Sequence, residues 1–272
     1  MEKKNTNDKS DRGSDKKNPP RVSLQGDKNK RELASALVAS GRSALDEGDF
    51  DDALDFFQRA RKLAPESVDA RVGLARVWLE FGEYDRALDQ AERAVRSESK
   101  RADAWEVRAH ALRLLDRFEE ALVDYDKSLA LDPKGFVALY GRAIARDMVG
   151  EIDGALDDFQ KCLALEPEFV AAFYDRGALY ANLGKWRESI EDYSKAIELD
   201  PYFARCYVAR GEAWAELGKF DRAIKDYNAA LDLDPELPEA YYYRSLARKR
   251  LGDDEAAARD LTIARDLGCE ED

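Results

Sequence analysis

The stretch FYDRGALYANLGKWRESIEDYSKAIELDP, residues 173–201, decides the fold of this chain. In its first half, apolar or small residues recur at steps of three and four, which is the spacing of one buried helix face. Gly184 follows the last apolar turn, where a glycine can adopt the left-handed conformation that ends a helix. A second helical pattern then runs to Pro201, which stops it because proline cannot continue a helix. The stretch therefore predicts two helices joined by a short turn.

The same pattern recurs along the chain with a period of 34 residues. Counterparts of Pro201 stand at Pro65, Pro133, Pro167 and Pro235, while Ser99 and Cys269 occupy the same position in the second and last copies. A fixed period of this length is typical of repeat architectures in which each unit is one supersecondary element. We therefore predict seven repeats, at residues 34–67, 68–101, 102–135, 136–169, 170–203, 204–237 and 238–271.

The residues that carry the repeat also carry a resemblance. Small residues stand at Gly177 and Ser189, and aromatic residues stand at Trp186 and Tyr193. A proline follows the second helical pattern in five of the seven copies. In these positions the array resembles the tetratricopeptide repeat family over about residues 34–271. The resemblance implies an all-α fold, a right-handed α-solenoid (superhelix) of seven helix-turn-helix repeats. It also implies that the first helix of each repeat lines a concave groove that binds peptides or partner proteins.

The N-terminal segment differs from the repeats in composition. Residues 1–33 contain ten Lys or Arg against six Asp or Glu, and almost no large apolar residues. Such a segment cannot bury enough apolar surface to offset the entropy lost on ordering. We therefore predict a disordered basic tail over residues 1–33. It is either a solvated leader or an arm that contacts an acidic partner or the acidic repeats.

Composition argues against several classes of function. The formal net charge of −13 repels phosphate, which disfavours binding to nucleic acid or to an anionic membrane. No apolar run approaches the roughly 20 residues that span a bilayer, and the first residues lack the apolar core of a secretory signal. We therefore expect a cytoplasmic protein that binds neither nucleic acid nor membrane.

The sequence offers no arrangement of residues suited to catalysis. The chain has one histidine, His110, and its three cysteines show no CxxC spacing, so a metal site is not indicated. No glycine-rich phosphate loop and no nucleophile elbow interrupts the repeats. We therefore expect no enzyme activity, no cofactor and no metal.

An arginine and an aspartate recur together in the last five repeats, at the seventh and twenty-third positions, and both are missing from the first two. The pairs are Arg108 with Asp124, Arg142 with Asp158, Arg176 with Asp192, Arg210 with Asp226, and Arg244 with Asp260. A half-buried guanidinium is tolerated where a carboxylate accepts its planar donors. We predict structural ion pairs, either between the two helices of one repeat or between the aspartate of one repeat and the arginine of the next. The alternative is a row of arginines that binds phosphate.

The resemblance assigns the groove to the second, fifth, ninth, twelfth and thirteenth positions of each repeat. In the fourth and fifth repeats only one of these ten positions is charged, in a chain that is 37% charged. An apolar patch with a charged rim is typical of an interaction site. The predicted partner-binding residues are Val137, Tyr140, Ile144, Met148, Tyr174, Ala178 and Asn182. The alternative is that some of these side chains pack against one another as ordinary core.

Two function classes remain after these exclusions. We expect a non-catalytic scaffold or adaptor that binds a peptide or helix of a protein partner in its groove. The alternative is a structural module that self-associates through its acidic array and basic tail.

The family's clamp for chaperone C-termini needs Lys and Asn at the fifth and ninth positions of a repeat. This chain has pairs such as Val72 with Arg76 and Glu106 with His110 there, so we expect no such clamp.

Overall fold

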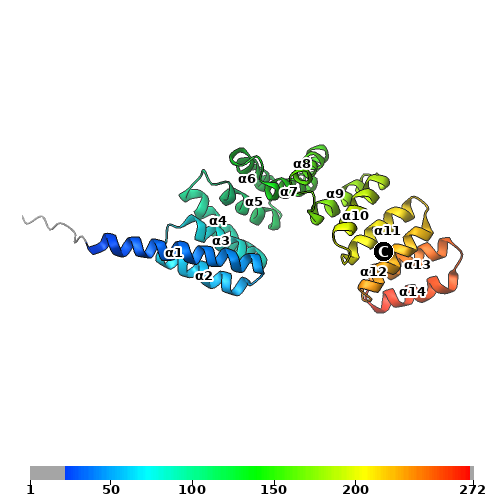
Figure 1. Ribbon diagram of the computed structural model, residues 1–272. Coiled ribbons are helices and arrows are strands. Elements are labelled where there is room, and N and C mark those ends of the chain that lie inside the picture. Colours follow the sequence, from blue (N-terminus) through cyan, green and yellow to red (C-terminus); the bar gives the residue numbers. More distant parts are fainter. Residues whose placement is uncertain (1–21, 270–272) are drawn as a thin grey trace, which may run out of the picture.

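The computed structural model describes residues 22–269, and this part of the chain is an all-α solenoid without strands. Its fourteen helices follow one another along the array (Figure 1). They are α1 (Val22–Glu47), α2 (Phe50–Leu63), α3 (Val68–Glu80), α4 (Tyr84–Ser97), α5 (Ala102–Leu114), α6 (Phe118–Leu131), α7 (Phe136–Met148), α8 (Ile152–Leu165), α9 (Val170–Asn182), α10 (Trp186–Leu199), α11 (Ala204–Glu216), α12 (Phe220–Leu233), α13 (Pro238–Arg250) and α14 (Asp254–Asp266). Within residues 22–269, no helix combines the length and the apolar character needed to cross a membrane.

The turn inside each helix pair depends on a residue with positive φ. Gly184, between α9 and α10, has φ +69°, and its N–H donates to the Ala181 carbonyl at 2.8 Å. The next N–H, of Lys185, reaches back to the Tyr180 carbonyl at 2.9 Å, so both free carbonyls of the helix end are satisfied. Asp116 takes the same conformation with φ 57° where the third pair has no glycine. Aspartate is one of the few side chains that tolerate it.

The array bends because its first and second helices pack differently. The first helices of neighbouring pairs contact one another, α1 with α3, α3 with α5 and so on to α11 with α13. Within the described chain, no two second helices bring their backbones equally close together. The inner side of the curve is therefore formed by α1, α3, α5, α7, α9, α11 and α13. We call this side the concave face. In the middle of the array, Figure 1 shows α5 and α7 toward the inside of the arch, below α6 and α8.

The core between the pairs is built from aromatic residues on second helices and small residues on first helices. Tyr125 of α6 is buried against Gly141 of α7, and Phe57 of α2 against Gly73 of α3. Tyr193 and Tyr227 pack in a similar way on glycines of their own pairs. Small residues let the helix backbones approach closely, and this close approach holds successive pairs together.

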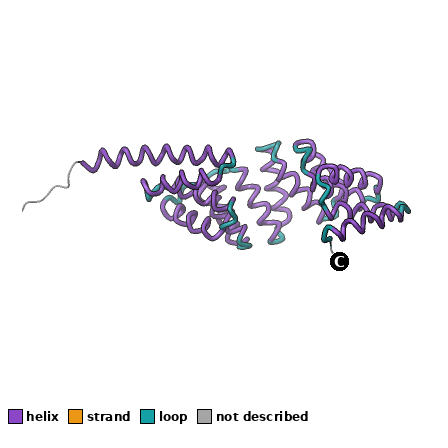
Figure 2. The backbone as a smooth tube through the Cα atoms, turned by 90° about the horizontal axis from the view of Figure 1, so that it is seen from below, coloured by secondary structure: helices purple, strands orange, loops and turns teal. Residues whose placement is uncertain are grey.

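The N-terminal boundary differs from the sequence prediction. The tail predicted as disordered spans residues 1–33, but α1 begins at Val22, so the prediction is wrong over residues 22–33. Packing of Ala34 and Leu37 nucleates the helix, and extending an existing helix costs far less than starting one. The N-terminal part of α1 projects beyond the other helices in both views (Figures 1 and 2). Residues 1–21 of the predicted tail lie outside the described residues.

Candidate functional site

The predicted groove residues lie on α7 and α9, two neighbouring helices of the concave face. Met148 and Val137 are large apolar side chains that stay 58% and 38% exposed. Ile144 and Ala178 are half-buried, and Asn182 is exposed. All seven predicted residues thus lie on first helices, and we call the surface that they form the central strip.

Two members of the central strip are partly structural. The Tyr140 ring packs on Phe169, with ring centroids 4.9 Å apart, and the Tyr174 ring packs on Phe203 at the same separation. Both tyrosines are half-buried. Aromatic contacts of this kind contribute about 0.5–1.5 kcal/mol beyond the area they bury. Tyr140 and Tyr174 therefore pack in part as core residues, which is the alternative that the sequence left open for the predicted groove residues.

A carboxylate that the sequence reasoning did not assign lies beside the strip. The Tyr140 hydroxyl donates to Asp175 Oδ2 at 2.6 Å, which joins α7 to α9. Burial raises the pKa of Asp175, and the hydrogen bond from Tyr140 only partly opposes the shift. The sequence could have suggested Asp175, because it directly follows the predicted groove residue Tyr174. It was not assigned because it stands outside the five groove positions.

Charges on the N-terminal part of the concave face are paired with one another. Asp69 of α3 accepts from Arg42 of α1 at 2.6 Å and from Arg101 at 3.1 Å. Glu106 of α5 accepts from Arg76 of α3 at 3.3 Å. Burial and the neighbouring arginines lower the pKa of His110 to about 4, so this imidazole is neutral at physiological pH. This part of the face is closed by ion pairs between neighbouring first helices.

All five predicted arginine–aspartate pairs are two-pronged forks between the helices of one pair, the first of the two predicted arrangements. In each, Nε and Nη2 donate to the two carboxylate oxygens, at 2.5 and 2.6 Å for Arg108 and 2.7–2.8 Å for the others. The aspartates are all buried. Each guanidinium is engaged by a carboxylate of its own repeat, which makes the fork an internal tie between helices.

The third nitrogen of some of these guanidiniums, Nη1, links successive helix pairs. This link was not predicted from the sequence. Nη1 of Arg142 donates to Asp126 at 2.6 Å, and Nη1 of Arg244 donates to Asn228 at 2.6 Å. Arg210 reaches Ser194 in the same way at 3.1 Å. In each case the acceptor precedes the arginine by sixteen residues and lies on the previous second helix. The sequence feature that could have predicted these links is the polar residue sixteen positions before the arginine, which recurs as Asp126, Ser194 and Asn228.

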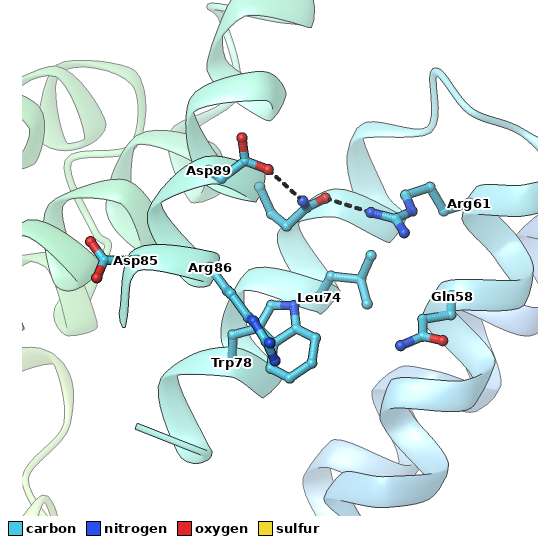
Figure 3. A pocket seen from close by; sticks show the side chains of 8 residues that line it. Gln58, Arg61, Leu74, Trp78, Asp85, Arg86 and Asp89 are labelled. Atoms are coloured by element: carbon cyan, nitrogen blue, oxygen red, sulfur yellow. Dashed lines mark hydrogen bonds between the residues drawn. The ribbon is translucent and has the colours of Figure 1, made fainter. Parts of the chain in front are cut away.

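A hollow of about 360 Å³ opens where the second pair lacks the fork. Leu74 and Gln90 replace the arginine and the aspartate there. Arg61 of α2 reaches Gln90 Oε1 at 3.1 Å, and Gln90 in turn donates to Asp89 at 2.8 Å (Figure 3). A cation from the previous pair thus partly fills the position that the arginine occupies in later pairs.

A second hollow, of about 380 Å³, lies between α11 and α13 at the C-terminal end of the concave face. Its wall includes Glu212, Glu216 and the rings of Phe220 and Tyr243. Burial, with the charges of Glu216 and Glu239, raises the pKa of Glu212 to about 7, and Tyr243 opposes the shift. Glu212 and Glu216 stand at the ninth and thirteenth positions of the sixth repeat, which the resemblance assigns to the groove, but the sequence did not predict this cavity.

Glu212 makes stability depend on pH. Its pKa rises from 4.5 in an unfolded chain to about 7 in the fold, so its destabilising effect appears as pH rises through that window. Allowing for partial solvent exposure, we expect Glu212→Gln to raise the free energy of unfolding by about 1–2 kcal/mol at pH 8 and by much less at pH 5. Urea denaturation at both pH values measures the difference, with the exposed Glu188→Gln as the control. An equal gain at both pH values would contradict the assignment.

The described residues contain no metal-ligand cluster, that is, no group of three or more His, Cys, Asp or Glu placed to hold a metal ion. Burial raises the pKa of the Cys162 thiol to about 11 and that of Cys206 to about 12. A thiol with so high a pKa is a poor nucleophile at neutral pH. Both cysteines therefore act as small core residues.

Family models for repeats of one kind match along the chain. Two models described as "Tetratricopeptide repeat" match residues 44–111 and residues 102–134 and 170–203. A third, described as "TPR repeat", matches residues 211–252. Together these matches cover more than half of the chain. No sequence among the curated proteins matches it.

Solved structures of similar fold are repeat proteins of the same kind. A tetratricopeptide repeat protein from Parabacteroides merdae has 23% identity and a TM-score of 0.61, over 88% of this chain and 95% of its own. PilF of Pseudomonas aeruginosa has 19% identity and a TM-score of 0.68, over 80% of this chain and 99% of its own. YrrB, described as a TPR protein with an unusual peptide-binding site, has 21% identity and a TM-score of 0.54, over 68% and 95%. The chain belongs to the tetratricopeptide repeat proteins.

Proposed function

We propose that this protein is a non-catalytic scaffold whose central strip binds a peptide or helix of a protein partner. The observation that carries the proposal is the exposure of Met148 and Val137 on the concave face. Between them lie half-buried apolar side chains, and charge pairs occupy the neighbouring helices. Apolar surface of this kind stabilises a complex when a partner removes it from water.

The shape of the site favours a narrow ligand. The central strip follows α7 and crosses to α9, so its residues lie on two adjacent helices of a curved surface. An extended peptide or an amphipathic helix fits such a surface with its apolar residues inward. YrrB, a structural neighbour, is described as having a peptide-binding site, which supports the same class of ligand here.

We expect Met148→Asp to weaken partner binding by about tenfold or more, because it places an uncompensated charge against an apolar ligand surface. Met148 is preferable to Tyr140 and Tyr174, since both tyrosine rings also support packing. The matched control is Val123→Asp. Val123 is similarly exposed, at 53%, but lies on the second helix α6, away from the concave face.

The partner can be detected by site-specific photo-cross-linking in the source cells. A photoreactive phenylalanine at position 148 should give cross-linked adducts that disappear with Val137→Asp, and the same group at position 123 should give none of them. Equal adducts from both positions, or adducts unaffected by Val137→Asp, would show that the central strip is not the binding surface.

A further inference from the structure

The hollow between α11 and α13 combines aromatic walls with carboxylates. Phe220, Tyr243 and Trp186 contribute rings, and Leu246 beside them is 44% exposed. Glu212 and Glu216 of α11 line the same cavity of about 380 Å³. A site built from π faces and carboxylates attracts a cation, because both present negative potential to it.

Within the described part of the chain, these carboxylates form no ion pair, in contrast to the carboxylates on the N-terminal part of the concave face. No Lys or Arg of residues 22–269 forms an ion pair with Glu212, Glu216 or Glu239. By contrast, Asp69 and Glu106 are both paired with arginines of adjacent first helices. Glu212 is half-buried, and burying a carboxylate without an ion-pair partner is costly. Glu216 is exposed, but its charge lies in the same hollow and adds repulsion. A cation that enters the hollow reduces both penalties.

We propose that this hollow binds the side chain of one Lys or Arg in a partner segment, with a large apolar residue of that segment against Leu246 and Phe220. The proposal rests on the proposed function, since it adds one property of the segment that binds the concave face. That segment carries a positive charge where it passes the hollow, which lies on the C-terminal side of the central strip. The aliphatic stem of a Lys or Arg suits the rings, and its charged end suits the carboxylates.

The local charges also define the pattern of the segment. Arg250 of α13 lines the same hollow, so its charge offsets one of the two carboxylates and leaves the hollow suited to one cation but not to two. The segment therefore carries an isolated basic residue with an apolar neighbour. The chain's own first 21 residues fit this pattern poorly, because apart from Met1 they contain no large aliphatic or aromatic residue to accompany a Lys or Arg.

Peptide-display selection on the immobilised full-length chain tests the proposal. We expect selected peptides to be enriched in an isolated Lys or Arg beside an aromatic or aliphatic residue. Replacing that Lys or Arg with norleucine in a synthetic selected peptide should weaken binding by about tenfold, measured by fluorescence anisotropy. The Glu212→Gln/Glu216→Gln double variant should bind the two synthetic peptides almost equally. The control Glu188→Gln/Glu191→Gln removes the same charge from exposed positions of α10 and should behave as the wild type.

Three outcomes would overturn the proposal. These are selected peptides without a basic residue, basic runs without an apolar neighbour, and a norleucine effect that persists in the Glu212→Gln/Glu216→Gln variant. If peptides lacking a basic residue are selected and their binding is lost on Met148→Asp, the proposed function stands and this inference fails. If no peptide is enriched at all, both fail. Circular dichroism spectra of the variants establish that each is folded.

Discussion

Replacing Asp158 with alanine should lower the free energy of unfolding by about 3 kcal/mol, because two half-buried guanidiniums lose the carboxylate that they share and keep only partners that are more exposed. The Asp158 side chain is 0% exposed. It accepts two hydrogen bonds from Arg142 at 2.7 Å and a third from Arg146 at 2.7 Å. The substitution removes the carboxylate that two guanidiniums share between α7 and α8, in the middle of the array.

Urea denaturation followed by circular dichroism measures this loss. Asp157→Ala is the matched control, since Asp157 is 55% exposed and pairs only with Lys161, and it should cost less than about 1 kcal/mol. Asp192→Ala should fall between the two, because a single arginine, Arg176, depends on that carboxylate. If Asp157→Ala and Asp158→Ala were equally destabilising, the fork would not be a structural tie.

Replacing Gly141 with alanine should cost about 2–3 kcal/mol, because the added methyl group overpacks the contact between the third and fourth helix pairs. A Cβ at Gly141 would overlap the hydroxyl and ring of Tyr125. Tyr125 is 1% exposed, so its ring has no free space into which to move. The denaturation midpoint of the variant measures the effect.

Gly26→Ala provides the control for this prediction. Gly26 also lies inside a helix, but a Cβ there would meet nothing within 4 Å. The substitution should therefore stabilise the chain by about 0.5–1 kcal/mol through helix propensity alone. Adding Tyr125→Leu to Gly141→Ala should cost less than the sum of the two single changes, since the shorter side chain makes room for the methyl group. Additive losses would show that the two residues do not compete for the same space.

The sequence determined what happens inside one repeat. Helical periodicity and the glycine at each turn predicted a pair of helices, and the 34-residue period predicted an array of such pairs. The recurrence of Arg142 with Asp158, and of the equivalent residues in other repeats, predicted ion pairs but left open whether each joins the helices of one repeat or of successive repeats. The resemblance to the family, applied in the same register, predicted Met148 and Val137 as groove residues. Each of these inferences depends on the spacing of residues along one or two helices.

Tertiary structure decided how one repeat meets the next. It joined Tyr140 to Asp175, linked Arg142 to Asp126 of the preceding pair, and enclosed Glu212 with Tyr243 in one hollow. Each of these contacts joins different repeats, so it depends on the rotation and translation between stacked pairs. Those quantities arise from how side chains such as Tyr125 and Gly141 fit together, and no single copy of the repeat encodes them.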